Sequence, residues 1–402
     1  MGESNLKDKI KLRDDKLQSL LEITQAINGN LSIEELVEHY RLSLSFQLHI
    51  PQILLFIHDQ SWQCLVGHGF NEIEPWKQHI ANLHDQAVLE ITTVEKENSH
   101  VVIIPIEKNN TAVAYVILGD GNEENMTISP SLKHMKFVQT LTSILVVAIQ
   151  NKKYIEQSIA QAAMARELHL AAEMQSYLLP KNLPSTPQIQ VEAFYNAHGE
   201  VGGDYYDFFY INPTDWITCI ADVSGKGLSA AFLMSNVQAH VRSLFQNTTI
   251  ELAEAVNRLN TIVNENAQGE KFVTFFIARF FAETNQMEYI NCGHNPAFLK
   301  NHDNGAHQWL SAQIPGLGMI DRFPNFESKW VSFLPQDELI CYTDGLVEIE
   351  NNSNLQFGEE GILQSINDNA SSSIQLLMDA VKNFKGDMPY VDDIALVSVR
   401  RR

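Results

Sequence analysis

Cysteine is scarce in this chain. Four of the 402 residues are cysteine, and none of them belongs to a CxxC pair: Cys64, Cys219, Cys292 and Cys341. Structural zinc sites and the disulfide frameworks of secreted proteins both need clustered cysteines, so we expect neither. The scarcity fits a reducing compartment, and we predict a cytoplasmic protein.

Positive charge is also in deficit. The chain has 28 Lys and Arg against 49 Asp and Glu, which gives a formal net charge of −21. Nucleic acids and anionic membranes are bound by basic faces, and no basic stripe is present, so the composition argues against both partners. Some of the surplus acids could instead be gathered to hold a cation.

Long apolar runs are missing. Pure runs such as residues 144–149 are far shorter than the ~18 residues that predict a membrane-spanning helix. The N-terminus has no apolar core of a signal peptide, and Leu6 stands where a myristoylation signal needs Ser or Thr. We therefore expect an unprocessed protein that does not cross a membrane.

Residues 1–150 mix helical and strand patterns. A helix is predicted at about residues 17–27, and Ser32 with Glu35 forms a capping box that opens a second helix to about residue 46. A further helix is predicted near residues 76–84. The predicted strands are residues 53–58, 63–67, 101–106 and 112–118. This order indicates an α/β domain.

A long helix follows, because no proline or glycine interrupts residues 131–179. An ordinary amphipathic helix packed on its own domain is one interpretation. Helices longer than ~25 residues rarely serve one small core, so we favour a coiled-coil linker over residues 151–183 that forms a homodimer. Apolar or small residues recur at a mean spacing of about 3.5, which keeps one seam facing a partner helix: Ile144, Ala148, Asn151, Ile155, Ile159, Ala162, Ala165, Leu168 and Ala172.

Strand patterns dominate residues 184–402, after the prolines at 180 and 184. Strands in hairpin order with few helices predict an α+β fold of two stacked antiparallel sheets with helices outside. The predicted helices are residues 229–245, 250–266 and 373–384, with Ser229 as the N-cap of the first. The predicted strands are residues 190–195, 207–210, 216–222, 272–281, 286–291, 297–300, 338–342 and 395–400.

Four motifs place carboxylates at predicted strand ends. They are Gly202-Gly203-Asp204, Asp222 in ADVSGKG, Asp344 in YTDG, and the pair Asp392-Asp393. A carboxylate at a sheet rim is costly to desolvate unless it is paired, and no matching basic residues flank these sites. A hard divalent cation would offset that cost, and aspartate oxygens suit Mg²⁺ or Mn²⁺ rather than Zn²⁺. Each motif alone is typical of a turn; the four together predict a metal site.

Six motifs occur in a fixed order: GEVGGDYYDFF, IADVSGKGLSAAFLMS, NCGHNPAFL, IPGLGM, CYTDGLVEIEN and VDDIALVSVR. The series resembles that of the SpoIIE/RsbU-type serine phosphatases, which are metal-dependent PPM (PP2C-like) phosphatases. The resemblance covers about residues 165–402 and implies a PP2C-like αββα sandwich in residues 184–402. The preceding AAEMQSYLLPKNLP resembles the linker helix of that family. Residues 1–150 resemble a GAF sensor domain through their element order and LLEITQAINGNLSIEELVEHY.

The resemblance also implies a role for each acid. Asp222 would bridge two Mn²⁺ or Mg²⁺ ions, with the Val223 carbonyl on the first ion and Asp344 on the second. Asp204 would lie near the first ion, and Asp204 and Asp222 are the residues we expect to carry catalysis. Either Asp392 or Asp393 would complete the set of ligands. The choice between these two adjacent acids, and between Mn²⁺ and Mg²⁺, stays open.

The same resemblance implies the reaction and the partners. We expect a serine/threonine protein phosphatase that acts on a phosphorylated STAS-domain, anti-anti-sigma-like regulator in a bacterial partner-switching pathway. The GAF-like domain would bind a small-molecule or protein signal. The alternative is a catalytically inactive, GAF-linked scaffold that binds protein partners, and the loss of an acidic ligand would mark it. All four acidic positions are filled here.

Two further residues have open roles. Lys226 lies between two glycines after Asp222, where its ammonium could meet phosphate or simply remain solvated in a turn. His294, in CGHNP, could donate a proton to a leaving group, but a structural turn histidine is the favoured interpretation. Residues 316–319 are expected to shape a loop near the site.

Overall fold

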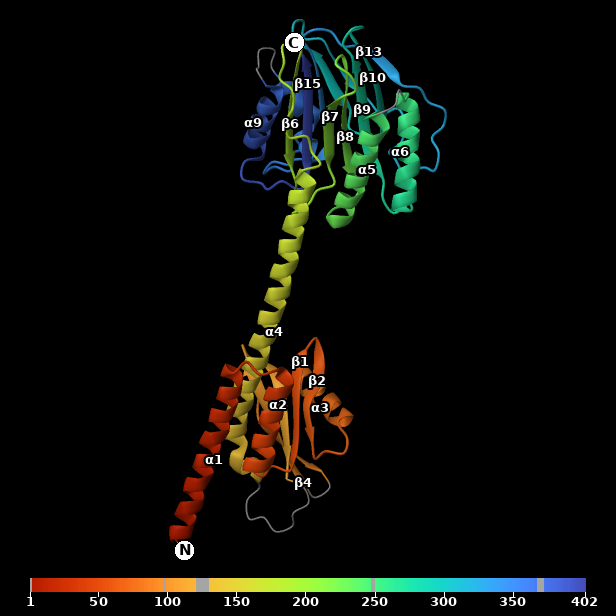
Figure 1. Ribbon diagram of the computed structural model, residues 1–402. Helices are drawn as coiled ribbons and strands as arrows, with labels where there is room; N and C mark the ends of the chain where they lie inside the picture. The colour runs from red at the N-terminus through yellow and green to blue at the C-terminus, as the bar shows by residue number, and fades with distance from the viewer. Residues whose placement is uncertain (1, 97–98, 121–129, 247–249, 367–371) are drawn as a thin grey trace. The chain divides into compact units, whose positions relative to one another are not determined.

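The computed structural model describes residues 2–96, 99–120, 130–246, 250–366 and 372–402. The chain divides into two compact units, Met1–Gln161 and Ala162–Arg402. One helix, α4 (Pro130–Ser176), begins in the first unit and ends in the second (Figure 1). Each unit is described by itself below.

The first unit has an antiparallel sheet of order β2-β1-β5-β4-β3. The capping box is confirmed, since Ser32 Oγ accepts the Glu35 amide (3.1 Å) and Glu35 Oε2 accepts the Ser32 amide (2.7 Å). The four predicted strands are present, and a fifth, the polar β3, was not predicted. The elements are α1 (Gly2–Asn28), α2 (Ile33–Leu42), the π-helix η1 (Ser43–Gln47), β1 (Gln52–Asp59), β2 (Ser61–His68), α3 (Glu74–Asp85), β3 (Thr92–Lys96), β4 (Ser99–Lys108) and β5 (Thr111–Gly119).

Helix α4 has two different stretches. In its first half, Val138, Leu141, Leu145 and Ile149 are buried in the core of the first unit. Further along, large apolar side chains are exposed: Tyr154, Ile155, Ile159, Met164, Leu170 and Met174. By length and composition alone the helix could cross a membrane, with a mean hydropathy of 1.3 over its most apolar window, 39% of which is buried. The core helix of a soluble domain meets the same criterion, so this is weak evidence for a membrane span.

The second unit stacks two antiparallel five-stranded sheets, of order β13-β10-β9-β8-β7 and β12-β11-β14-β15-β6. The strands of the first are β13 (Lys329–Ser332), β10 (Gln286–Cys292), β9 (Val273–Phe281), β8 (Asp215–Val223) and β7 (Tyr205–Tyr210). Those of the second are β12 (His307–Leu310), β11 (Ala297–Asn301), β14 (Asp337–Tyr342), β15 (Ile394–Arg401) and β6 (Ile189–Asn196). Apolar side chains from both sheets share one core.

Helices cover the outside of this sandwich. The helices α5 (Leu228–Gln246) and α6 (Leu252–Ala267) lie on the first sheet, and α9 (Ser373–Lys385) lies on the second (Figure 1). Two short helices, α7 (Asp344–Val347) and α8 (Gly358–Ser365), pack beside α9. The predicted α+β sandwich of antiparallel sheets with helices outside is confirmed.

Several differences from prediction in the second unit are short elements. The strands β12 and β13 and the helices α7 and α8 were missed because each has too few residues to show a clear period. The prediction that Ser229 is an N-cap is wrong. Helix α5 begins at Leu228, so Ser229 lies within its first turn.

Candidate functional site

Four chain segments bring the predicted acids to one rim of the sandwich. In the first sheet, Asp204 directly precedes β7 and Asp222 lies near the end of its neighbour β8. In the second sheet, Asp344 directly follows Thr343 after β14, and the pair 392–393 precedes the neighbouring β15. The Thr343 hydroxyl donates to Asp204 Oδ2 (2.7 Å), which ties the two sheets together at this rim.

Glycines in two of the motifs permit close backbone approach. A Cβ added to Gly345 would lie 1.9 Å from the Asp393 carbonyl oxygen, so any larger residue would push the Asp344 loop away from β15. A Cβ on Gly202 would lie 2.3 Å from the Tyr195 hydroxyl and 2.8 Å from Asp393 Oδ2. The two glycines therefore let the loops that carry Asp204 and Asp344 close on Asp393.

The carboxylates raise one another's pKa. Burial raises the pKa of Asp222 to about 7, and the charges of Asp344, Asp392 and Asp393 add to the effect. Burial and the Asp222 charge hold the pKa of Asp204, which is 1% exposed, well above its ordinary value. Burial and Asp392 also raise the pKa of Asp344. Negative charge is thus concentrated at the rim and incompletely compensated by the protein.

The two adjacent acids play different structural parts. Asp393 accepts backbone N–H groups at both oxygens, from His198 (2.7 Å) and from Gly203 (2.7 Å). Asp392 faces Lys226, whose Nζ lies 2.9 Å from its Oδ2. No basic residue flanks Asp392 in the sequence, but the fold brings Lys226 to it from a loop that is remote in sequence.

Within the residues that the structure describes, no three His, Cys, Asp or Glu side chains are arranged ready to hold a metal ion. The hydrogen bonds explain this, because several acids are already engaged. Thr343 holds Asp204, two amides hold Asp393, and Lys226 holds Asp392. The predicted residues are nevertheless gathered at one rim.

His294 is buried close to this rim. Its amide donates to Asn291 Oδ1 (2.8 Å), and its Nδ1 lies 2.8 Å from the hydroxyl of Thr274, the strand partner of Asp222. Burial lowers the pKa of His294 to about 4, so the imidazole is neutral near pH 7. The 316–319 loop also lies at the start of β9, where Leu317 exchanges two backbone hydrogen bonds of 2.8 Å with Val273.

Three residues beside the acids were not predicted from the sequence. Thr343 orients Asp204, and the buried hydroxyl of Tyr195 lies beside Gly202 with no hydrogen-bond partner among the residues that the structure describes. From the last turn of α4, Gln175 donates to the Gly202 carbonyl (2.6 Å) and accepts the Gly202 amide (3.2 Å). Thr343 lies within a motif, but no local pattern could have identified Tyr195 or Gln175.

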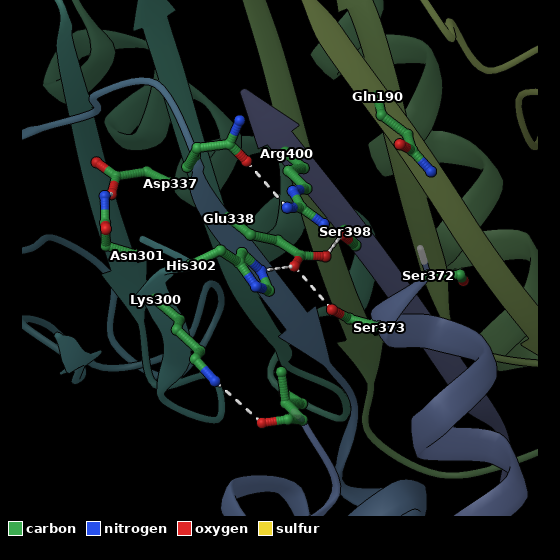
Figure 2. A network of polar contacts seen from close by, with 12 residues as sticks. Gln190, Lys300, Asn301, His302, Asp337, Glu338, Ser372, Ser373, Ser398 and Arg400 are labelled. Atoms are coloured by element: carbon green, nitrogen blue, oxygen red, sulfur yellow. Dashed lines mark hydrogen bonds and ion pairs between the residues drawn. The ribbon is translucent and has the colours of Figure 1, made fainter. Parts of the chain in front are cut away.

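A different buried carboxylate, Glu338, lies under the start of α9 (Figure 2). His302 Nε2 donates to its Oε2 (2.5 Å), the Ser373 hydroxyl donates to the same oxygen (2.7 Å), and the Ser398 hydroxyl donates to Oε1. Burial raises the pKa of Glu338, but the bonds from His302, Ser398 and Ser373 outweigh burial and hold the pKa below its ordinary value. This acid is satisfied by the protein itself.

Comparison with protein families finds a match within the second unit. A family model described as Stage II sporulation protein E (SpoIIE) matches residues 212–402. That range includes Asp222, Asp344 and Asp392 but not Asp204. Three of the four motifs thus lie inside the family match.

Individual proteins and one solved structure are also similar. Protein IcfG of Synechocystis sp. is 24% identical over 378 residues, which cover 85% of this chain and 59% of IcfG. Phosphoserine phosphatase RsbU of Bacillus subtilis is 28% identical over 249 residues, which cover 60% of this chain and 72% of RsbU. The SiaA-PP2C domain of Pseudomonas aeruginosa superposes with a TM-score of 0.52 at 16% identity, over 60% of this chain and 98% of that domain.

These likenesses differ in what they establish. The structural neighbour shares the fold of the second unit, namely stacked antiparallel sheets with helices outside. The chain spans little more than half of IcfG, so that protein cannot define the activity of this one. Residues 212–402 are thus similar to the SpoIIE family, and the second unit shares its fold with a PP2C domain.

Proposed function

We propose that the protein is a metal-dependent serine/threonine protein phosphatase whose active site is the acidic rim. The observation that supports this most directly is the gathering of carboxylates from four chain segments at one rim, where burial raises the pKa of the buried Asp204 and of the half-buried Asp222 and Asp344. Perturbed carboxylates of this kind cluster at functional sites. The PP2C-like fold of the unit points in the same direction.

The residues present suit a hard divalent cation. The donors available at the rim are carboxylate oxygens and the backbone carbonyl of Val223, with no thiolate among them, as Mg²⁺ and Mn²⁺ prefer. Asp222, Asp344, Asp392 and Asp204 would hold two ions. Asp392 is preferred to Asp393 because backbone amides already occupy both oxygens of Asp393. When bound, such ions lower the pKa of a water nucleophile and offset charge on the phosphoryl group.

The protein's own residues position this chemistry. Burial shields Asp222 and Asp204 from bulk water. A carboxylate interacts more strongly with a cation where water is excluded. Thr343 fixes one oxygen of Asp204, and Asp393 fixes the Gly203 amide, so both sides of the rim are held by hydrogen bonds. Positioning and electrostatics account for most of the catalysis in phosphoryl transfer.

The substrate and the regulation are further parts of this proposal. The relatives include a protein named phosphoserine phosphatase, which supports a phosphoserine or phosphothreonine substrate. We infer that the substrate is a STAS-like regulator of a partner-switching pathway in the cytoplasm. The first unit, as a GAF-like domain, would bind the small-molecule or protein signal that controls activity.

We also propose a homodimer through the linker helix. Support comes from the row of exposed apolar residues along α4, which includes Ile155 at 60% and Ile159 at 64% exposure. Light scattering of the full chain tests this directly. A dimer that becomes a monomer in Ile155→Glu/Ile159→Glu supports the proposal, and a wild-type monomer contradicts it.

Phosphate release tests the activity. With Mn²⁺, the full chain should hydrolyse an aryl phosphate and a phosphoserine peptide, and Asp222→Asn should lower turnover at least about a thousandfold. Asp215→Asn is a matched control, because Asp215 lies at the opposite end of the same strand. Unchanged turnover in Asp222→Asn would contradict the metal mechanism. A wild type that is inert with Mn²⁺ would favour the scaffold alternative.

A further inference from the structure

Lys226 lies across the acidic rim in a position that neither sequence interpretation foresaw. Its Nζ is 2.9 Å from Asp392 Oδ2 and donates to the Val391 carbonyl (2.9 Å), from a loop 165 residues away in sequence. The ammonium thus bonds twice to the segment that carries a proposed metal ligand. It is therefore neither a free turn residue nor, in this state, open to phosphate.

The contact occupies the oxygen that a metal ion would need. Asp392 Oδ1 accepts the Asp393 amide (2.8 Å), and Oδ2 is paired with Lys226. A divalent cation cannot bind Oδ2 at the same place as an ammonium, because the two positive charges repel at that distance. The metal and the lysine are therefore mutually exclusive partners of this oxygen.

Lys226 can leave Asp392 at a low cost in free energy. Its side chain is 54% exposed and that of Asp392 is 32% exposed, so water can replace the contact. Pairs of this exposure contribute little to stability and are easily exchanged.

We propose that Lys226 is the internal counter-cation of the metal-free site and competes with the metal ion for Asp392. Metal binding then exchanges an ammonium for a metal at this carboxylate. This inference rests on the metal site of the proposed function. It assigns Lys226 a role in setting metal affinity, and the exchange releases the ammonium beside the place where a phosphoryl group would bind.

The test measures Mn²⁺ binding without substrate, by isothermal titration calorimetry of the full metal-free chain. Lys226→Gln should bind Mn²⁺ about threefold to fivefold more tightly than wild type, because the competing partner is gone. Lys226→Arg keeps the charge and should remain within about twofold of wild type.

Lys271→Gln is the matched control. Lys271 Nζ donates to the Ser224 carbonyl (2.9 Å) in the loop that also carries Lys226, and it makes no ion pair with the rim acids among the described residues. Its loss removes the same charge nearby, so its Mn²⁺ affinity should change less than about twofold because solvent screens the more distant interaction.

The outcomes separate the two proposals. If wild type binds no Mn²⁺, the metal site itself is wrong. If wild type binds Mn²⁺ but Lys226→Gln binds no more tightly than Lys271→Gln, the metal site stands and the competition is wrong. Tighter binding in both lysine variants alike would show a general charge effect and would also overturn the competition.

Discussion

The second unit contains two groups of buried carboxylates with opposite electrostatics. At the rim, burial and neighbouring acids raise the pKa of Asp204, Asp222 and Asp344. Under α9, Glu338 is as deeply buried as Asp204, yet three donors hold its pKa below the ordinary value (Figure 2). The difference lies in the hydrogen-bond donors that each region supplies, and it marks the rim as the region that requires an external charge.

Asp207 shows that proximity to the rim is not the cause. It lies three residues after Asp204 and is fully buried, yet Arg242 of α5 binds both of its oxygens at 2.6 Å. The fold can thus provide a bidentate cation where an acid is structural. Among the described residues, the ion pair recorded at the rim is that of Asp392 with the half-exposed Lys226. This difference separates the structural acid Asp207 from the acids of the rim.

The largest effect on stability should follow from replacing Glu338, whose carboxylate is hydrogen-bonded by the protein. Glu338→Gln should cost about 3 kcal/mol of unfolding free energy, because His302 and two hydroxyls lose a charged acceptor inside the protein. Asp222→Asn should leave metal-free stability unchanged or raised, because its charge is unfavourable there. Urea unfolding of the metal-free chain measures both.

Glu283 is exposed, so Glu283→Gln is the control for losing a glutamate charge. This substitution should change the free energy of unfolding little. Equal losses in Glu338→Gln and Asp222→Asn would remove the distinction between the two regions.

A smaller effect should appear in the pH dependence of the metal-free protein. The pKa of Asp222 is raised from 3.8 to about 7 in the fold, so the folded state binds more protons, and this acid's contribution to stability is lost as pH rises from about 4 to 7. The decline should reach roughly 2 kcal/mol, because the coupled acids share their protons. Glu338 has the opposite sign, and its contribution is lost as pH falls below about 4.5.

Thermal unfolding between pH 4.5 and 7.5 with a chelator present checks this prediction. Asp222→Asn should flatten the decline relative to wild type. If the variant and wild type keep the same slope, the rim acids are not the source.

The smallest effect on stability should come from removing one of the three hydrogen-bond donors to Glu338. Ser373→Ala should cost about 1 kcal/mol, since His302 and Ser398 continue to satisfy Glu338. The N-cap of α9 is Ser372, so the helix cap is retained. The urea midpoint measures the loss, and the exposed Ser353→Ala provides the reference. A loss as large as that of Glu338→Gln would mean that the donors act as one unit.

Local pattern predicted much of this molecule. The Ser32 capping box, the hairpins of the first unit and the strands of the sandwich follow from periodicity and turn residues, which act over a few neighbours. The four acidic motifs were found because each carries an acid and mostly a glycine at a strand end. Short elements such as β12 and α7 were missed because they have too few residues to show a period.

The sequence by itself therefore determined which acids exist and at which strand ends they lie. The tertiary structure alone decided their partners: Gly203 with Asp393 across 190 residues, Thr343 with Asp204 across 139, and Lys226 with Val391 across 165. Contacts between residues so far apart depend on how two sheets stack, and no local period encodes that. For this reason the sequence shows Lys226 beside Asp222 but does not predict its contact with Asp392 at the acidic rim.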